Sequence, residues 1–207
     1  MNIITISREF GSGGRELGKR LADELGYDYY DSEIIRALSQ KSGMDAGYIE
    51  KALSNHGWQN VPITFRMTLS GNIYYQSDRI NLLIVQKQVI EEIAAMGKNC
   101  IIVGRNADVI LAKYHPFNIF VCAQMQDKLR RCRERAPQGE ELSDKEMIAK
   151  IKHVDKVRAQ TRELIGGTPW GQRTGYHLTV NTGDWSIKEL TPAVAGFAQA
   201  YFARACF

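Results

Sequence analysis

Short apolar runs alternate along the chain with longer segments whose apolar positions recur every three or four residues. The runs predict strands, at residues 2–7, 27–30, 100–103, 118–123 and 176–180. The longer segments predict helices, at residues 15–25, 32–40, 107–111, 127–135, 144–164 and 186–205, with a further long helix that begins after Ser77-Asp78. Because strands and helices alternate, we expect an α/β fold with a largely parallel sheet and helices on both faces.

Residues 43–76 do not fit this alternation. Residues 45–53 are compatible with a short helix, but residues 55–75 mix aromatic, glycine and polar residues without a clear period. A long irregular segment within a compact domain is often a functional insert. The chain has 207 residues, which is enough for one α/β domain that carries such an insert.

The first predicted strand is followed by the glycine-rich stretch Gly11-Ser12-Gly13-Gly14, after which the first predicted helix begins. Glycine lets backbone N–H groups approach a phosphate closely, and a helix N-terminus adds positive potential. Arg8 and Arg15 flank the stretch and add charge. We therefore predict a phosphate-binding loop. The alternative is an ordinary tight turn between a strand and a helix.

The loop matches the phosphate-binding motif G-x-x-x-x-G-K-[ST] only in part. If the motif ends on Gly14, Arg15 stands in the place of the lysine. Glu16 then replaces the hydroxyl residue, and Glu9 replaces the first glycine. A second alignment, from Gly13 to Lys19, puts the lysine inside the predicted helix. The dinucleotide motif G-x-G-x-x-G fails, because its last glycine falls on Glu16.

Polar residues also follow other predicted strands. Asp31 follows residues 27–30, and Arg105 and Asn106 follow residues 100–103. Ligands bind at the carboxyl ends of strands in open parallel sheets, and the arginine fork pairs well with phosphate. Arg79 lies in a first helical turn, where a cation opposes the helix dipole, which gives some support to a ligand role. The alternatives are a helix cap for Asp31, a salt bridge for Arg105 and a solvated surface position for Arg79.

Two of the predicted helices are basic. The first carries Arg130, Arg131, Arg133 and Arg135. The second begins with a capping box, Ser143 to Glu146. Its apolar stripe is Ile148, Ile151 and Val154, and its polar side carries Lys152, Asp155, Lys156, Arg158 and Arg162. A solvated face with surface ion pairs explains part of this pattern. It does not explain the like charges of Lys152 and Lys156, four residues apart, which favour a basic lid that covers a ligand.

Composition narrows the class of protein further. The net charge of +4 suits an anionic ligand such as a nucleotide but is too small to indicate nucleic acid binding. Four cysteines without C-x-x-C spacing predict reduced thiols in a cytoplasmic protein, not disulfides. The four histidines do not cluster at metal-ligand spacings, so we expect no zinc site. No signal-peptide pattern opens the chain, and no apolar run approaches the ~18 residues of a membrane span, so we expect no membrane association.

Together these motifs resemble the cytidylate kinase-like proteins, a divergent bacterial branch of the P-loop nucleoside monophosphate kinases. The resemblance covers nearly the whole chain and rests on motifs in the right order. They are Thr5 to Glu16, Tyr29-Tyr30-Asp31, Gly104-Arg105-Asn106, Val154 to Ala159, and Trp170-Gly171 with Tyr176 and Asn181-Thr182.

This resemblance implies a five-stranded parallel sheet wrapped by helices in a single domain, with an acceptor-binding insert at about 43–80 and a lid at about 136–170. It implies transfer of the γ-phosphoryl group of ATP to CMP or dCMP, with Mg²⁺. The donor phosphates would be bound by Arg8, Gly11, Ser12, Gly13, Gly14, Arg15 and Glu16, and Glu16 would hold Mg²⁺. The acceptor would be bound by Asp31, Arg79, Arg105 and Asn106, and the lid residues would be Lys152, Asp155, Arg158 and Arg162. The catalytic residues implied are Arg15, Arg105, Arg158 and Asp155.

The chain departs from the pattern of that family at the loop, where the lysine and the hydroxyl residue are missing. Asn106 also replaces a carboxylate beside the acceptor. Two alternatives therefore stay open. The first is a nucleotide-binding or regulatory protein without kinase activity. The second is a kinase for another small acceptor, which Asn106 and the segment 55–76 favour. The acceptor base and the oligomeric state are left open by the sequence.

Overall fold

The computed structural model describes residues 1–31, 83–135 and 142–204. The chain divides into two compact units, one formed by Met1–Tyr30 with Gly97–Phe207 and the other by Asp31–Met96. In the second unit the described part is Asp31 and a helix over residues 83–95. Arg79, the predicted helix at 32–40, the irregular segment at 55–75 and residues 136–141 lie outside the described residues.

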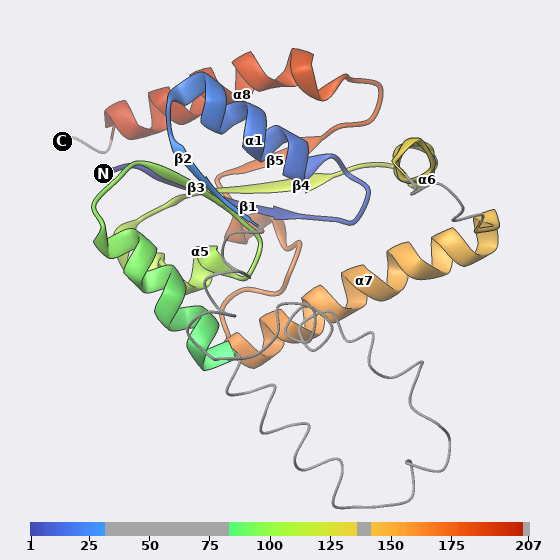
Figure 1. The fold of residues 1–207 in the computed structure, drawn as a ribbon, viewed down its shortest axis with the longest axis horizontal. Helices are drawn as coiled ribbons and strands as arrows, with labels where there is room; N and C mark the ends of the chain where they lie inside the picture. Colours follow the sequence, from blue (N-terminus) through green and yellow to red (C-terminus); the bar gives the residue numbers. More distant parts are fainter. Residues whose placement is uncertain (32–82, 136–141, 205–207) are drawn as a thin grey trace, which may run out of the picture. The chain divides into compact units, whose positions relative to one another are not determined.

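The first unit contains a five-stranded sheet in which every neighbouring pair is parallel (Figure 1). Its strands are β1 (Ile3–Arg8), β2 (Asp28–Tyr30), β3 (Cys100–Val103), β4 (Phe117–Cys122) and β5 (Leu178–Asn181). Their order in the sheet is β2-β3-β1-β4-β5, so β1 is central. The predicted parallel α/β sheet is confirmed, and each predicted strand begins and ends within two residues of an observed one.

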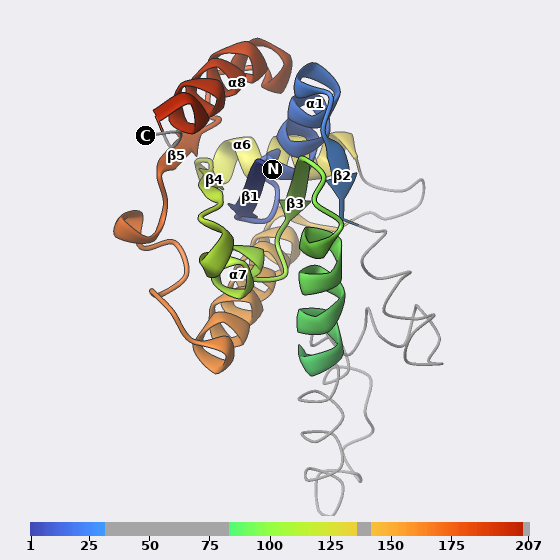
Figure 2. The same ribbon diagram turned by 90° about the vertical axis from the view of Figure 1, so that its left-hand side faces the viewer.

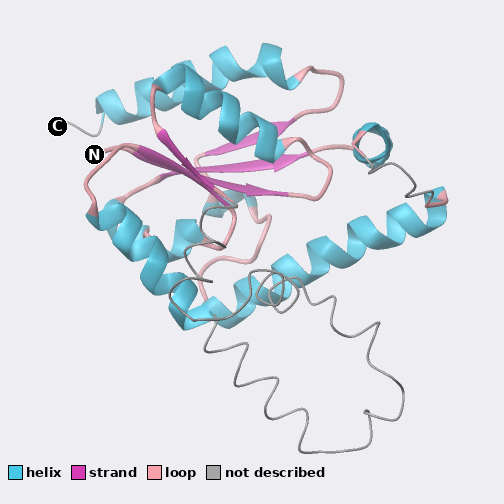
Figure 3. Ribbon diagram, viewed as in Figure 1, coloured by secondary structure: helices cyan, strands magenta, loops and turns pink. Residues whose placement is uncertain are grey.

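Helices cover both faces of this sheet, as Figure 2 shows. On one face lie α1 (Gly14–Leu25) and α8 (Ile187–Arg204), and on the other lie α5 (Ala107–Ile110) and α7 (Asp144–Ile165). α6 (Met125–Glu134) follows β4, and two short 3₁₀ helices, η3 (Ala112–Tyr114) and η4 (Arg173–Gly175), join the later elements. Figure 3 shows that the loops after β1 and β4 leave the same edge of the sheet.

The core of the first unit forms because β1, β3 and β4 are mostly apolar and are buried on both faces. Ile4, Ile6, Ile101 and Phe117 are completely buried in it. Continuous apolar runs of this kind are typical of parallel strands that helices cover on both sides. No helix among the described residues is both long enough and apolar enough to cross a membrane.

The helix ends follow the sequence signals. α1 ends at Gly26, which adopts a left-handed φ of 67°. α7 begins with the predicted capping box, in which Ser143 and Glu146 each bond the backbone N–H of the other.

The buried face of α7 differs from the predicted one. The apolar residues buried are Met147, Ile151 and Val157, whereas Ile148 and Val154 are only half-buried. Helical spacing places Met147 and Ile151 on the same face as Asp155 and Arg158. The sequence pattern failed here because these charged side chains bond the backbone of Phe10 and Arg8 and are turned inward with the apolar ones.

Candidate functional site

The central position of β1 determines where a ligand can bind. From β1 the sheet extends through β3 and β2 on one side and through β4 and β5 on the other. In open α/β sheets, ligands bind at the carboxyl ends of the strands at such a switch point. The glycine loop, residues 9–13, leaves β1 at that point and leads into α1.

The backbone of this loop presents unused donors. Gly11 and Gly13 have positive φ angles of 76° and 81°, and Gly13 is the N-cap of α1. No atom among the described residues accepts a hydrogen bond from the N–H groups of Gly11, Gly13 or Gly14. Together with the N-terminal end of the α1 dipole, these donors form a site suited to an anion.

Glycine is required at Gly13 by packing as well as by its φ angle. An added Cβ at this position would lie 2.6 Å from Cδ1 of Ile187, the first residue of α8. The side of the loop that packs on α8 is therefore closed to a ligand. A ligand can reach the loop only from the side to which its unused N–H groups point.

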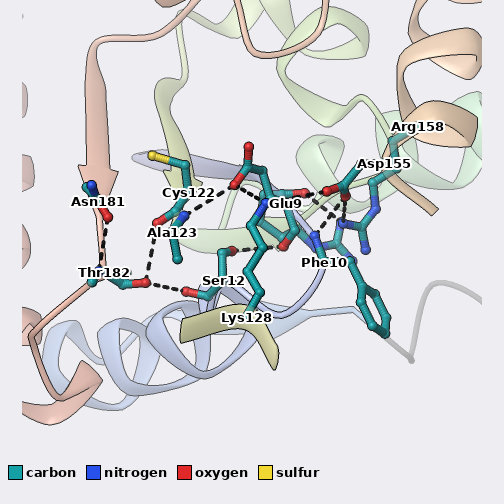
Figure 4. Close-up of polar contacts among 12 residues, drawn as sticks. Glu9, Phe10, Ser12, Cys122, Ala123, Lys128, Asp155, Arg158, Asn181 and Thr182 are labelled. Atoms are coloured by element: carbon teal, nitrogen blue, oxygen red, sulfur yellow. Dashed lines mark hydrogen bonds and ion pairs between the residues drawn. The ribbon is translucent and has the colours of Figure 1, made fainter. Parts of the chain in front are cut away.

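Glu9 anchors the loop to α6 and β4 (Figure 4). Its Oε2 accepts hydrogen bonds from the N–H of Ala123, at 3.2 Å, and pairs with Nζ of Lys128, at 2.6 Å. Its carbonyl accepts the hydroxyl of Ser12, at 2.8 Å. Only 7% of the Lys128 side chain is exposed, so the pair is shielded from solvent on the lysine side. Glu9, the first residue of the loop, therefore fixes the course of the loop.

Thr182 holds the opposite side of the loop from the end of β5. Its hydroxyl donates to the carbonyl of Ser12, at 2.6 Å, and accepts from Nη1 of Arg131, at 2.9 Å. Nη2 of Arg131 donates to the Thr182 carbonyl, at 2.6 Å. Ser12 is itself completely buried. The loop is thus pre-organised by α6 and β5, and its donors are held in position before a ligand arrives.

A third support comes from α7. Oδ1 of Asp155 accepts the N–H of Phe10, at 2.7 Å, and Nη1 of Arg158 donates to the carbonyl of Arg8, at 2.8 Å. Figure 4 shows Asp155 in contact with both Phe10 and Arg158. Asp155 and Arg158 form an ion pair at 3.1 Å. Burial, only partly offset by the Phe10 N–H and by Arg158, raises the pKa of Asp155 above its ordinary value.

Arg8, Arg105 and Arg158 lie close to one another beside the loop, since Arg158 bonds the carbonyl of Arg8 and the guanidinium group of Arg8 lies against Gly104. The pKa of Arg158 is lowered to about 9, first by burial and then by the charges of Arg8 and Arg105, so all three lie within one electrostatic neighbourhood. Like charges gathered in one place raise the potential there and favour an anion. The pKa of Arg158 still leaves it protonated at neutral pH.

Arg105 and Asn106 occupy unusual backbone conformations at the end of β3. Gly104, Arg105 and Asn106 have consecutive φ values of 78°, 60° and 53°. Glycine and asparagine tolerate this region, but arginine adopts it rarely, and such conformations concentrate at functional sites. The N–H of Gly104 donates to the carbonyl of Ile6, at 2.8 Å, which joins this turn to the end of β1.

Residues 3–184 match the family model described as the cytidylate kinase-like family. The chain belongs to this family. Membership supports a kinase that acts on nucleotides, and the resemblance derived from the sequence motifs is confirmed. No curated protein sequence is significantly similar to the chain.

Solved structures share the fold of this cytidylate kinase-like chain. An uncharacterized protein from Eubacterium ventriosum matches with a TM-score of 0.70 and 21% identity, over 96% of this chain and 99% of that one. Shikimate kinases from Bacteroides thetaiotaomicron and Acinetobacter baumannii match with TM-scores of 0.58 and 0.54, at 16% and 13% identity. The alignments cover 96% of this chain and 98% of the first kinase, and 97% of this chain and 94% of the second. Because these identities are low, the matches show a shared P-loop kinase-like fold.

Two predicted donor residues of this family member lie on the first turn of α1. Arg15 is exposed. Glu16 pairs with Arg20 through one carboxylate oxygen, at 2.8 Å, and with Arg135 through the other. Glu16 is therefore already engaged by two cations. No group of three or more His, Cys, Asp or Glu residues within the described ranges is arranged to hold a metal ion. These residues do not provide a ready-made Mg²⁺ site.

The predicted lid residues separate into different environments. Asp155 and Arg158 support the loop, as described above. Arg162 forms an ion pair with Asp108 at 2.7 Å, and the two side chains are 3% and 2% exposed. It thereby ties α7 to α5 instead of facing a ligand. Lys152 is exposed on α7.

The predicted acceptor residues are divided between the two units. Arg105 and Asn106 belong to the first unit, at the end of β3. Asp31 belongs to the second unit and is buried. Arg79 lies outside the described residues, so its role stays a prediction.

Sequence reasoning missed the residues that hold the loop, namely Glu9, Lys128, Arg131 and Thr182. A signal for Glu9 existed, since it is a carboxylate just before a glycine-rich stretch that arginines flank. Its partner Lys128 lies more than 100 residues away along the chain, as does Thr182 from Ser12. Only the sheet order brings them together.

Proposed function

We propose that this protein transfers the γ-phosphoryl group of ATP to a nucleoside monophosphate, with CMP or dCMP as the first acceptors to test. The observation that carries the proposal is the meeting of two sets of donors at the carboxyl end of β1. One set is the backbone N–H groups of Gly11, Gly13 and Gly14. The other is the group of Arg8, Arg105 and Arg158, in which Arg158 bonds the Arg8 carbonyl and Arg8 lies against the turn that carries Arg105.

The chemistry asked of these groups is positioning and charge stabilisation. An oxygen of the acceptor phosphate attacks the γ-phosphorus, the bond to the β,γ-bridging oxygen breaks, and ADP leaves with the negative charge. The transition state spreads charge over three equatorial oxygens. Loop N–H groups aimed at the donor phosphates, and guanidinium groups beside them, stabilise that charge without reorganising.

Acceptor recognition is assigned to residues at the neighbouring strand end. Arg105 would bind the acceptor phosphate, and Asn106 would contact the acceptor with an amide where relatives in the family pattern carry a carboxylate. Asp31 and Arg79 are proposed for the acceptor sugar and phosphate on the strength of the family resemblance. Family membership and the strained turn at 104–106 support this assignment.

Mg²⁺ is implied by the family, but the loop residues do not fit a protein-bound Mg²⁺, because Glu16 is paired with two arginines. Mg²⁺ commonly reaches kinase sites through the phosphates of the substrate. We therefore assign charge neutralisation to the three arginines and no step to a metal held by Glu16.

Two other functions remain as competing proposals. The missing loop lysine favours a nucleotide-binding or regulatory protein that does not transfer phosphate. The replacement by Asn106 favours a kinase for a different small acceptor, and two of the structures that share the fold are titled shikimate kinases, one of them in complex with shikimate.

A coupled assay of ADP release separates these functions. The full-length protein is given MgATP with each of CMP, dCMP, UMP, AMP, GMP and shikimate. We expect ADP release that depends on CMP or dCMP and exceeds the rate without acceptor by at least tenfold. Release with shikimate alone would support the different-acceptor kinase. Binding of MgATP without release for any acceptor would reject the kinase and support the binding protein.

A further inference from the structure

The side chain of Arg8 occupies the space beside the first residue of α1. An added Cβ at Gly14 would lie 2.6 Å from Cβ of Arg8 and 3.1 Å from its Cγ. Real Cβ atoms do not approach so closely, so a side chain at position 14 is incompatible with Arg8 in this conformation. Gly14 is glycine because Arg8 fills the space that a side chain there would need.

The guanidinium group of Arg8 continues from Gly14 to Gly104. An added Cβ at Gly104 would overlap Nη1 of Arg8 and lie 2.7 Å from its Cζ. The arginine thus extends from the end of β1, past the start of α1, to the turn after β3. Its charged end lies beside the turn that carries Arg105.

This packing chooses between the possible alignments of the loop motif. Gly13 is the N-cap of α1 and Gly14 its first residue. If the last glycine of G-x-x-x-x-G-K-[ST] is Gly13, then the lysine position is Gly14 and the first glycine position is Arg8. The chain has therefore exchanged the two residue types: a cation where the motif has glycine, and glycine where the motif has the cation.

We propose that Arg8 is the donor-phosphate cation of this protein and takes over the role of the missing loop lysine from the opposite side of the same space. This inference rests on the proposed function, since it assumes that the loop binds a nucleotide polyphosphate. In this alignment Arg15 stands at the position of the hydroxyl residue. The alignment that ends on Gly14 instead placed Arg15 at the lysine position.

Charge around Arg8 fits the inference. Its backbone carbonyl accepts a hydrogen bond from Nη1 of Arg158. The charges of Arg8 and Arg105 add to burial in lowering the pKa of Arg158. The cation that replaces the lysine is therefore one of a group of arginines, and a group of this kind favours a polyanion such as a triphosphate.

The test is the affinity of the full-length protein for MgATP, measured by isothermal titration calorimetry. Arg8→Met keeps the aliphatic stem over Gly14 and removes the charge, and Arg15→Met removes the rival charge. Lys19→Met is the matched control, because Lys19 is an exposed cation on α1 paired with Asp23. We expect Arg8→Met to weaken binding about tenfold or more, as loss of a charged hydrogen bond does, and Lys19→Met to change it less than twofold.

A rescue variant gives a result that a merely structural role would not. Gly14→Lys alone is expected to destabilise the fold, because its Cβ meets Arg8. In Arg8→Gly/Gly14→Lys the contact with Arg8 is removed, the contact with Cβ of Val121 at 3.2 Å is the closest one left, and the usual arrangement of the motif is restored, so MgATP affinity is expected within about threefold of the wild type.

Two results would overturn the inference: an unchanged affinity in Arg8→Met, or a double variant that folds, judged by circular dichroism, but binds no better than Arg8→Met. If the double variant does not fold, the comparison of Arg8→Met with Lys19→Met decides. Because binding and not turnover is measured, a wild type that binds MgATP but releases no ADP rejects the proposed kinase without deciding the role of Arg8.

Discussion

Lys128 is a cation that the fold buries almost completely. Its ammonium group contacts Glu9 at 2.6 Å and Asp155 at 3.8 Å, so it joins the glycine loop, α6 and α7 at one point. Burying a charge is costly unless it is paired, and removing one partner leaves the others uncompensated. Lys128 is for this reason a structural residue of the site.

We predict that Lys128→Met lowers the free energy of unfolding by about 2 kcal/mol or more, because Glu9 and Asp155 lose their shared cation. Urea denaturation measures this loss. Arg130→Met is the control on the same helix, since Arg130 pairs with Asp127 at the surface, and it should cost clearly less than Lys128→Met. Equal losses in the two variants would show that the buried network has no special role.

The carboxylate of Glu16 links α1 to the residue that follows α6. Burial acts to raise its pKa, but hydrogen bonds from Arg20 and Arg135 outweigh it and lower the pKa below the ordinary value of 4.5. A lowered pKa contributes stability that is present above pH 4.5 and is lost as the pH falls through the folded-state pKa.

We therefore predict that the stability difference between the wild type and Glu16→Gln shrinks as the pH is lowered from 6 to 3. Thermal unfolding at fixed ionic strength measures the difference. Glu24→Gln, an exposed site on the same helix, is the control. A difference that stays constant across this range would contradict the ion pairs described for Glu16.

At the scale of elements, α7 supports the glycine loop through Asp155 and Arg158, and the lid role predicted for this helix stays a prediction. Asp155 and Arg158 reach two consecutive peptide units of the loop, the carbonyl of Arg8 and the N–H of Phe10. One turn beyond Arg158, the same helix is fixed by the buried pair of Arg162 and Asp108. Both contacts lie on one face, which the apolar pattern alone did not reveal.

We predict that Asp155→Ala increases the hydrogen-exchange rate of the Phe10 amide by at least tenfold, because this amide loses its acceptor. The amide of Glu9 is the internal control, since it donates to the carbonyl of Val121 and should keep its protection. If Phe10 exchanged no faster than in the wild type, α7 would not be what holds the loop.

The helices and strands were predictable because their signals are local. Gly26 ends α1, the pair Ser143 and Glu146 begins α7, and the apolar run at Cys100–Val103 forms a buried strand. The face of α7 was not predictable, because the partners of Asp155 and Arg158 lie about 150 residues earlier in the chain. Hydrophobic periodicity cannot show that a charged side chain will be turned inward to meet them.

At the scale of the whole molecule, the sheet order creates the site. Apolar runs specify strands but not their neighbours, so the central place of β1 does not follow from its sequence. The central position of β1 brings the ends of β3, β4 and β5 around the glycine loop. Arg105, Lys128 and Thr182 lie in the segments that follow these three strands. The sequence pointed to the loop and to Arg158. The supports of the loop emerged only with the topology.

The central claim is that the loop amides bind the phosphates of a nucleotide. It is tested most directly by the amide NMR spectrum of the full-length protein during titration with MgATP. We predict that the amide signals of Gly11, Gly13 and Gly14 shift in step with saturation, while those of Gly26 and Gly97, glycines in turns away from the loop, stay unchanged. MgATP binding that leaves all three loop amides unshifted would contradict the account.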